Sequence, residues 1–323
     1  MEIIPQILLL VVGFVLLIKG ADFFVDGASS TAQNFKIPKI LIGLTIVAFG
    51  TSAPELAVSI QALASGNTDM VLGNVIGSNI LNILLILGLA ALIHPIRIKN
   101  NTIRKEIPIT ILVSTLLVVL FLDVQLSSGT TDQITRSDGI AILLFFAIFL
   151  YYLINTAISE RKREKKKETR EKPRWKLLPS LGIVALGLAG IIFGSDLVVN
   201  SASSIATIIG MSDRIISLTV IAFGTSLPEL VTTVVSARKG ETDLALGNIL
   251  GSNIFNICVV LGIPVAIFGT VTPESFHIID LIVLVFSAVL LWVFSISKHK
   301  ISRVEGALML VAFIVYYSVI FII

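Results

Sequence analysis

Two short stretches place a carboxylate in the middle of apolar sequence. Residues 50–55 read Gly-Thr-Ser-Ala-Pro-Glu and residues 224–229 read Gly-Thr-Ser-Leu-Pro-Glu, so they end in Glu55 and Glu229. Each motif also carries two hydroxyl side chains beside its proline, namely Thr51, Ser52, Thr225 and Ser226. Carboxylates and hydroxyls are hard oxygen ligands, and no His or Cys cluster accompanies them. The pattern therefore favours Ca²⁺, Mg²⁺ or Na⁺ over zinc or copper.

The proline of each motif predicts a break in its helix. Pro54 has no N–H and its ring clashes with the carbonyl of Gly50, so we expect the helix to open between about Ala48 and Ala53. Pro228 repeats the arrangement. Freed carbonyls are tolerated in a bilayer only where they line a cavity inside the protein, and a bound cation would satisfy them. Capping by the serines does not account for two mid-membrane glutamates, each costing roughly 2.5–3.5 kcal/mol or more.

A second motif follows each glutamate. It reads LGNVIGSNILN at residues 72–82 and LGNILGSNIFN at residues 246–256. Its polar side chains are four residues apart and form one stripe on a helix. We expect the deepest of them, Asn82 and Asn256, to face the site, and Asn74, Asn79, Asn248 and Asn253 to join helices. Gly73-x-x-x-Gly77 and Gly247-x-x-x-Gly251 predict close approach to neighbouring helices.

Both motifs belong to one long internal repeat. Residues 44–88 align without a gap with residues 218–262, so each residue pairs with the one 174 positions later (229 minus 55). If each copy has five spans, an odd number, the two copies cross the membrane in opposite directions. The loop after the first motif carries Ala64 and Ser65 where the second carries Arg238 and Lys239, as expected if only the second loop is cytoplasmic. Inverted repeats around a midplane site are typical of secondary transporters.

The composition is that of a membrane protein. Hydrophobic residues make up 55% of the 323 positions, charged residues 14%, and the mean hydropathy is +0.98. We expect an all-α protein with ten transmembrane helices, arranged as two inverted five-helix repeats with helices broken at the midplane. The spans are predicted at about 3–29, 39–65, 69–94, 107–122, 139–158, 178–205, 214–237, 244–270, 276–297 and 304–322.

The distribution of charged residues predicts where the two repeats end and how the chain is oriented in the membrane. The first repeat is expected at residues 1–158, a basic cytoplasmic linker at 159–177, and the second repeat at 178–323. Nearly all of the 24 Lys and Arg residues fall in loops on one side, and the opposite loops hold only Arg136 and Arg214. Because cytoplasmic loops are enriched in Lys and Arg, both termini should face outward.

These motifs, in two inverted copies, resemble the α-repeats of the sodium/calcium exchanger family, within the calcium:cation antiporter superfamily. The resemblance covers nearly the whole chain and implies a multi-pass antiporter of the cell membrane that exchanges Ca²⁺ for Na⁺. It implies that Glu55 and Glu229 bind Ca²⁺ with the backbone carbonyls of Thr51 and Thr225. Na⁺ would use the same glutamates, the hydroxyls of Thr51, Ser52, Thr225 and Ser226, and the carbonyls of Ala48 and Ala222. Asn82 and Asn256 would face the central position.

One departure bears on stoichiometry. Some members, including potassium-dependent ones, have an aspartate where this chain has Asn256, so the expected site charge here is −2. One Ca²⁺ neutralises that charge and three Na⁺ exceed it by one. The linker is too short for the calcium-sensing domains of the animal exchangers, so the chain resembles a minimal, prokaryotic-type member.

Shared carboxylates would make the two ions compete for the same site.

Spans 1 and 6 are the expected moving part, because they carry glycines and small residues suited to sliding. Asp22 and Asp26 in span 1 and Asp196 in span 6 are expected to have a structural or interfacial role, and a second funnel for cations is the alternative. No cofactor, nucleic acid or obligatory protein partner is expected, only the bilayer and the transported ions.

Three other functions remain open. A calcium/proton antiporter of the same superfamily would use Glu55 and Glu229 as proton carriers, but such members typically carry Gly-Asn-x-x-Glu instead. A cation channel could also use paired carboxylates, yet it would not require inverted broken helices. An enzyme is not expected, because the chain has neither a phosphate-binding loop nor a His-Glu-x-x-His zinc motif.

Overall fold

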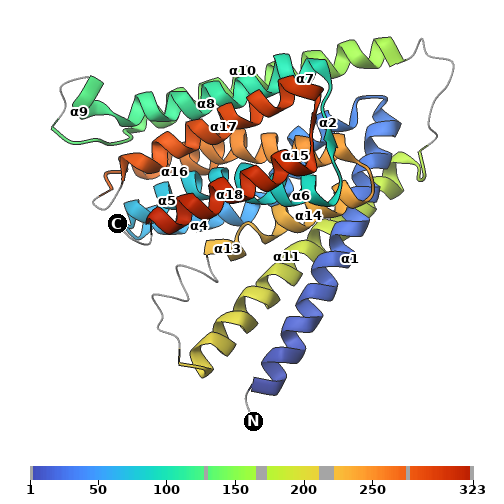
Figure 1. The fold of residues 1–323 in the computed structure, drawn as a ribbon, viewed down its shortest axis with the longest axis horizontal. Helices are drawn as coiled ribbons and strands as arrows, with labels where there is room; N and C mark the ends of the chain where they lie inside the picture. The colour runs from blue at the N-terminus through green and yellow to red at the C-terminus, as the bar shows by residue number, and fades with distance from the viewer. Residues whose placement is uncertain (1–2, 127–129, 165–172, 211–221, 274–276, 321–323) are drawn as a thin grey trace.

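The protein is built almost entirely of helices (Figure 1). The computed structural model describes residues 3–126, 130–164, 173–210, 222–273 and 277–320. The first half of the chain forms α1 (Ile3–Phe35), α2 (Lys39–Ile42), the π-helix η1 (Gly43–Val47), α3 (Ala48–Thr51), α4 (Ala53–Ala64), α5 (Thr68–Ile80), the π-helix η2 (Leu81–Leu87), α6 (Gly88–Ile93), β1 (Ile96–Arg97), α7 (Asn100–Arg104), α8 (Glu106–Phe121), α9 (Asp123–Leu126) and α10 (Arg136–Glu164). The second half forms α11 (Leu177–Ile208), α13 (Ala222–Gly224), α14 (Leu227–Arg238), α15 (Thr242–Phe255), the π-helix η4 (Asn256–Leu261), α16 (Gly262–Phe268), α17 (Ile278–Lys298), β2 (Lys300–Ile301) and α18 (Arg303–Ile320).

Several of these helices can cross a membrane. Among the described residues, seven are long and apolar enough by themselves, and an eighth span is the pair Lys39–Thr51 and Ala53–Ala64, bent by 46°. Two predicted spans remain. α8 has 16 residues and lies where the fourth is expected, and the seventh begins in residues 211–221, outside the described residues. The arrangement is consistent with the ten predicted spans.

The two halves meet along α1 and α11, which lie side by side and extend away from the other helices (Figure 1). A Cβ added to Gly187 would lie 2.8 Å from the Gly20 carbonyl oxygen, and one added to Gly194 would lie 2.9 Å from the Gly13 oxygen. These contacts run in opposite chain directions, and the 174-residue shift converts one into the other. The two helices are therefore antiparallel, as inverted repeats require.

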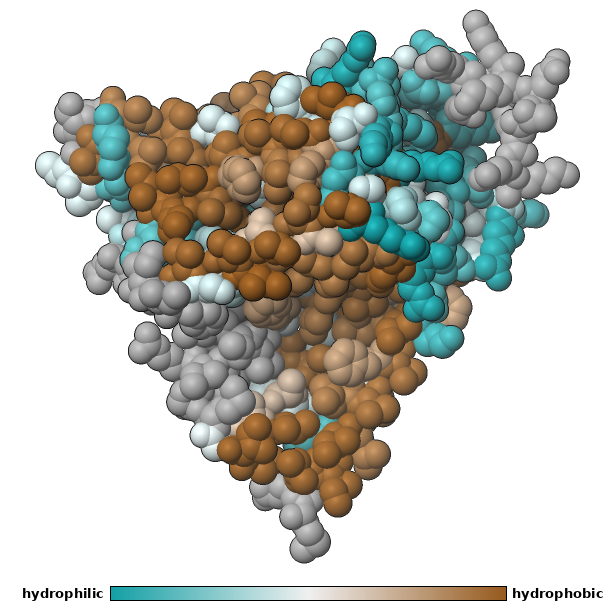
Figure 2. Space-filling view, viewed as in Figure 1, coloured by the Kyte–Doolittle hydropathy of each residue, from teal (hydrophilic) through white to brown (hydrophobic). Residues whose placement is uncertain are grey.

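The centre of the molecule is formed by the helices that carry the second motif. In their apolar windows, 72% of the residues of Thr68–Ile93 and 89% of those of Thr242–Phe268 are buried, against 17% for α1. Apolar side chains cover much of the outer surface seen in Figure 2, and hydrophilic ones gather at one end. The outer helices thus present an apolar surface to lipid, and the central pair is enclosed by protein.

Two helices extend beyond their predicted spans. α1 continues past residue 29 to Phe35. Asp22 and Asp26, in its second half, meet cationic partners. Lys239 lies 2.7 Å from Asp26, and Arg174 lies 2.9 Å from the other oxygen of the same carboxylate. These ion pairs join α1 to the residue after α14 and to the segment before α11, and the role of the two aspartates stays a prediction. α10 continues to Glu164, inside the predicted linker, whose extent stays a prediction.

Candidate functional site

Both proline motifs break their helices in the same way. Ser52 separates α3 from α4 with φ −88° and ψ 7°, and Ser226 precedes α14 with φ −90° and ψ 5°. The first opening is narrower than the predicted 48–53. α3 remains helical from Ala48 to Thr51, because the backbone N–H of Ser52 still donates to the Ala48 carbonyl at 3.0 Å. Only Ser52 leaves the helix, so the bend of 46° is concentrated at one residue.

The two breaks hold the predicted carboxylates across the repeat boundary. Glu55 and Glu229 are 1% and 0% exposed. The Ser52 hydroxyl donates to Oε1 of Glu229 at 2.8 Å, and the Ser226 hydroxyl donates to Oε1 of Glu55 at 3.4 Å. Each glutamate is therefore bound by the serine of the other repeat. This pairing brings four of the predicted site residues together.

Several buried oxygens at the site lack a hydrogen-bond donor among the described residues. They are Oε2 of Glu55, Oε2 of Glu229, Oδ1 of Asn82 and Oδ1 of Asn256. Buried polar atoms are nearly always bonded in folded proteins, so this concentration of acceptors calls for a ligand that accepts electron pairs. A hard cation has that property and prefers oxygen ligands. The described residues hold no group of three or more His, Cys, Asp or Glu side chains placed to bind one metal ion.

The other amides of the second motif mostly support the broken helices. Asn74 donates to the Ser59 hydroxyl at 2.9 Å and to the Glu55 carbonyl at 3.1 Å, fixing α4 on α5. Asn248 donates to the Thr233 hydroxyl at 3.0 Å in the equivalent position of the second repeat. Asn248 also accepts a hydrogen bond from the Thr51 hydroxyl at 3.1 Å. Thr51 thus lies at the site, held by the opposite repeat.

The remaining predicted ligands lie at the breaks or beside them. Thr225 lies in the second break, and Ala222 begins α13. The Ala48 carbonyl accepts from the Ser52 N–H and, at 3.4 Å, from the Thr51 hydroxyl. The role of each as an ion ligand stays a prediction.

Two features of the site were missed by sequence reasoning. Asn82 and Asn256 lie at the start of π-helices, η2 and η4, which alter the regular stripe expected along α5 and α15. Such segments are rare and are frequent at functional sites. Hydropathy patterns carry no signal for them. The second feature is Ser252, whose hydroxyl lies 3.4 Å from Oε1 of Glu229. The signal that could have identified Ser252 is its position four residues from Asn248 and Asn256, on the same polar stripe of the helix.

The glycines of the second motif differ in what they contact. A Cβ on Gly247 would lie 2.7 Å from the Ile40 carbonyl oxygen, and one on Gly251 would lie 2.8 Å from the Cα of Leu44. The predicted close approach is confirmed for this pair. A Cβ added to Gly73 or Gly77 would meet no atom of the described residues of neighbouring elements within 4 Å. By the 174-residue shift, the residues that contact Gly247 and Gly251 correspond mainly to positions outside the described residues, so that prediction is not tested.

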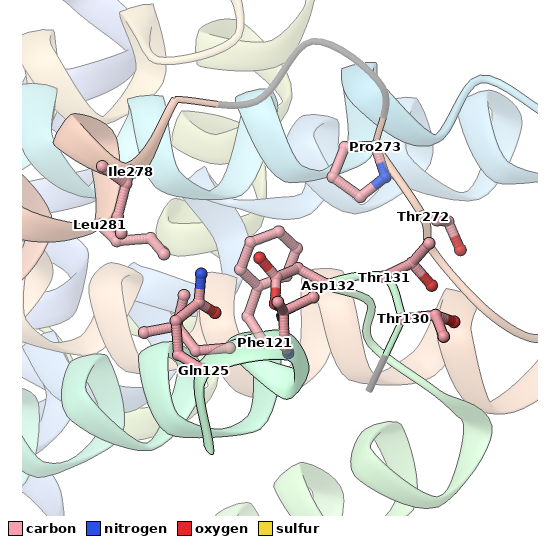
Figure 3. Close-up of a pocket in the computed structure, with 11 residues that line it drawn as sticks. Phe121, Gln125, Thr130, Thr131, Asp132, Thr272, Pro273, Ile278 and Leu281 are labelled. Carbon is pink, nitrogen blue, oxygen red and sulfur yellow. Dashed lines mark hydrogen bonds between the residues drawn. The ribbon is translucent and has the colours of Figure 1, made fainter. Parts of the chain in front are cut away.

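A cavity of about 360 Å³ lies apart from the carboxylates (Figure 3). It is lined by residues from α8, α9 and α17 and from the segments that precede α10 and α17. Its one carboxylate, Asp132, accepts the backbone N–H of Val124 at 2.8 Å. None of the predicted ligands lines it, so it is not the cation site.

Comparison with known proteins gives one consistent picture. The family model for sodium/calcium exchanger protein matches residues 5–155 and 179–322. The relative "Putative antiporter CaxA" of Alkalimonas amylolytica is 44% identical, over 96% of this chain and 97% of its own. Sodium/calcium exchanger MaX1 of Methanosarcina acetivorans is 30% identical, over 97% and 98%. Among solved structures, the sodium-calcium exchanger NCX_Mj soaked with zero Na⁺ and Ca²⁺ superposes with a TM-score of 0.84 at 32% identity, covering 99% of this chain and 100% of that one.

Proposed function

The chain belongs to the sodium/calcium exchanger protein family, and on that premise we propose that it exchanges Ca²⁺ for Na⁺ by alternating access at one central site. The observation that carries the proposal is the pair of buried carboxylates, each bound through one oxygen by the opposite repeat and lacking, on the other oxygen, a donor among the described residues. Two such oxygens supply a charge of −2 and match one Ca²⁺. Two or more Na⁺ ions could use the same oxygens in turn.

Antiport follows from shared ligands. A chain that has released its cation leaves two uncompensated carboxylates inside the bilayer, each of which costs roughly 2.5–3.5 kcal/mol or more. The loaded forms therefore reorient more readily than the empty form. Because Ca²⁺ and Na⁺ both need Glu55 and Glu229, the site returns with whichever ion replaced the first. Coupled exchange is the consequence.

We assign the ion ligands from the resemblance to the family. Ca²⁺ would take the free oxygens of Glu55 and Glu229 with the Thr51 and Thr225 carbonyls. Na⁺ would add the hydroxyls of Ser52 and Ser226. A hydroxyl that donates to a carboxylate still offers a lone pair to an ion, so the observed hydrogen bonds are compatible with coordination. Asn82 and Asn256 would place their amide oxygens at the centre.

Movement between the two states is assigned to α1 and α11. Their glycine contacts leave few interdigitating side chains between the backbones, a surface on which helices can slide. The Lys and Arg distribution supports a cytoplasmic position for the end that holds residues 159–177, with both termini outside, in the cell membrane.

The experiment that tests this function is ⁴⁵Ca²⁺ uptake into proteoliposomes at clamped membrane potential. Vesicles loaded with Na⁺ should accumulate Ca²⁺, and vesicles given only a pH gradient or no gradient should not. The Glu229→Gln chain in matched vesicles is the control for leakage. Uptake driven by the pH gradient alone would assign the protein to proton-coupled exchange, and uptake that needs no counter-ion would indicate a channel.

A further inference from the structure

A second polar cavity, of about 980 Å³, lies at the hydrophilic end of the molecule. It is bordered by the α1–α2 connection, the β1–α7 segment, the beginning of α8, the last turns of α10 and the beginning of α15. α2, α7 and the end of α10 gather at this end in Figure 1, where Figure 2 shows mostly hydrophilic side chains. None of the predicted transport ligands lines this cavity.

The charges around the cavity are unevenly distributed. Four basic residues line it, Lys36, Lys39, Arg97 and Lys99, against four acidic ones, Glu106, Glu160, Glu241 and Asp243. Lys39 is bound to Glu241 at 2.8 Å and Lys99 to Asp243. Arg97 is exposed and Lys36 is half-buried, whereas Thr102 and Glu106 are buried. Of the charged residues that line the cavity, the one that is buried, Glu106, is acidic, and the two that are exposed, Arg97 and Lys99, are basic.

Glu106 differs from the other charged residues that line the cavity, because its carboxylate is buried. Its side chain is 1% exposed, and its Oε1 accepts the Tyr152 hydroxyl at 2.6 Å. Its Oε2 is buried and has no hydrogen-bond partner in the part of the chain that the structure describes. Thr156 and Glu160 follow Tyr152 by one and two helical turns on the same face of α10, and both line the cavity. Thr102, one turn before Glu106 in the chain, lines it as well.

A helix-end role does not account for this arrangement. Glu106 is the first residue of α8, where a carboxylate is stabilised by the helix dipole. Asp280, in the first turn of α17, has the same kind of partner, since its Oδ1 accepts the Tyr316 hydroxyl at 2.8 Å. Asp280 lines neither of the two cavities and leaves no buried oxygen without a partner. The helix dipole accounts for a carboxylate in the first turn of each helix. It does not account for the Oε2 of Glu106, which is buried without a donor among the described residues.

We propose that Glu106, Glu160, Thr102 and Thr156 form a second cation site, which binds Ca²⁺ apart from the transport pathway. Glu106 supplies a buried carboxylate oxygen that has no hydrogen-bond donor among the described residues, and the Glu160 carboxylate and the two threonine hydroxyls, which line the same cavity, add hard oxygens of the kind that Ca²⁺ prefers. Tyr152 holds one oxygen of Glu106 and leaves the other for the ion. The cavity adjoins α2, which leads into the first broken helix, and α15, which carries Ser252. An ion bound there would join elements of both repeats.

The proposal can be tested by terbium luminescence on the full chain in detergent, with Tb³⁺ as a probe for Ca²⁺. The background is Glu55→Gln with Glu229→Gln, which removes both transport carboxylates, so the result does not depend on the proposed exchange activity. Two antennae are close to the site. The Tyr152 hydroxyl binds Glu106, and Nε1 of Trp292 donates to the carbonyl of Ile103 at 3.2 Å.

In this background we expect sensitised terbium emission that Ca²⁺ displaces. Adding Glu106→Gln should weaken Tb³⁺ binding by at least about tenfold. Adding Asp280→Asn, the matched carboxylate with a tyrosine partner, should leave the affinity unchanged. The proposal is overturned if Ca²⁺ displaces no emission in the background, if Glu106→Gln binds Tb³⁺ as well as the background does, or if Asp280→Asn weakens binding equally. Should the Glu106→Gln chain fail to purify, Thr156→Val decides, because unchanged affinity there would equally contradict the site.

Discussion

The Ser52 hydroxyl of the first repeat donates to Oε1 of Glu229 in the second at 2.8 Å, and the Ser226 hydroxyl of the second repeat donates to Oε1 of Glu55 in the first at 3.4 Å. The 174-residue shift converts one contact into the other. Both carboxylates are thus held by groups on the far side of the repeat boundary. Any displacement of one repeat against the other changes the positions of both glutamates relative to their serines, which links ion binding to the movement of the repeats.

The shorter of these two hydrogen bonds, from Ser52 to Glu229, should contribute more to Ca²⁺ binding than the longer one. Hydrogen bonds to charged groups contribute about 1.5–3 kcal/mol. Ser52→Ala should therefore raise the KM for Ca²⁺ in Na⁺-driven uptake by roughly tenfold or more, since 1.4 kcal/mol is a factor of ten. Ser226→Ala should have a smaller effect. An equal or larger effect of Ser226→Ala would show that the two contacts are not ranked by their lengths.

The two glutamates should be indispensable separately. Glu55→Gln and Glu229→Gln keep the size of the side chain and remove one of the two negative charges, so neither should transport Ca²⁺ at a measurable rate. The assay is Na⁺-driven ⁴⁵Ca²⁺ uptake at equal amounts of reconstituted protein. Asp132→Asn, in the cavity that holds no predicted ligand, is the matched control and should exchange normally. Retained exchange in both glutamine variants would remove these residues from the site.

Asn256 offers a place to add charge. Both polar atoms of its amide are buried without a partner among the described residues, so an aspartate there would raise the charge of the site from −2 to −3. We expect Asn256→Asp to alter the selectivity among Ca²⁺, Na⁺ and K⁺. Uptake is compared with Na⁺, with K⁺ and with both inside the vesicles. A flux profile identical to that of the natural chain would mean that Asn256 only packs.

Close contact between α1 and α11 makes a further prediction. A Cβ on Gly187 would lie 2.4 Å from the backbone nitrogen of Phe24, so Gly187→Ala forces the helices apart. Overpacking of this kind costs about 1–3 kcal/mol, and the exchange rate should fall with the Tm. Gly182→Ala on the same helix meets no described residue within 4 Å and is the control. If both variants have the same Tm and exchange rate as the natural chain, α1 and α11 are not closely packed in the membrane.

The ion pairs at the basic end should have a modest effect. Lys239 contacts Asp22 and Asp26, and its side chain is 28% exposed. Exposed ion pairs contribute about 0–1 kcal/mol, so Lys239→Ala should change the exchange rate by less than roughly fivefold. The remaining rate should also depend less on added choline chloride, because the pair that salt screens is gone. A complete loss of exchange would assign Lys239 a role beyond these contacts.

Much of the fold could be predicted from the chain itself. Apolar runs give the order of the helices, and the repeat gives the antiparallel pairing seen between α1 and α11. Pro54 and Pro228 locate both breaks, because proline removes a backbone donor wherever it occurs. Glu55 and Glu229 stand out because a buried carboxylate in apolar sequence is costly.

Other features depend on tertiary packing. The π-helices at Asn82 and Asn256 leave no trace in hydropathy, because the residues that follow both asparagines are uniformly apolar and a change of helical period does not alter that pattern. The exchange of Ser52 and Ser226 between repeats depends on how the two halves pack together. Glu106 directly precedes the predicted span 107–122, where a carboxylate suggests a solvated helix end. Its burial arises from contacts with α10, some 46 residues later in the chain.

The most direct test of the account is whether Ca²⁺ and Na⁺ exclude each other. ⁴⁵Ca²⁺ binding to the purified chain is measured as Na⁺ replaces choline at constant ionic strength, with Glu106→Gln as a parallel sample that isolates the central site. A site shared through Glu55 and Glu229 predicts that the apparent Kd for Ca²⁺ rises continuously with Na⁺. A Kd that levels off at high Na⁺, with both ions bound at once, would contradict it.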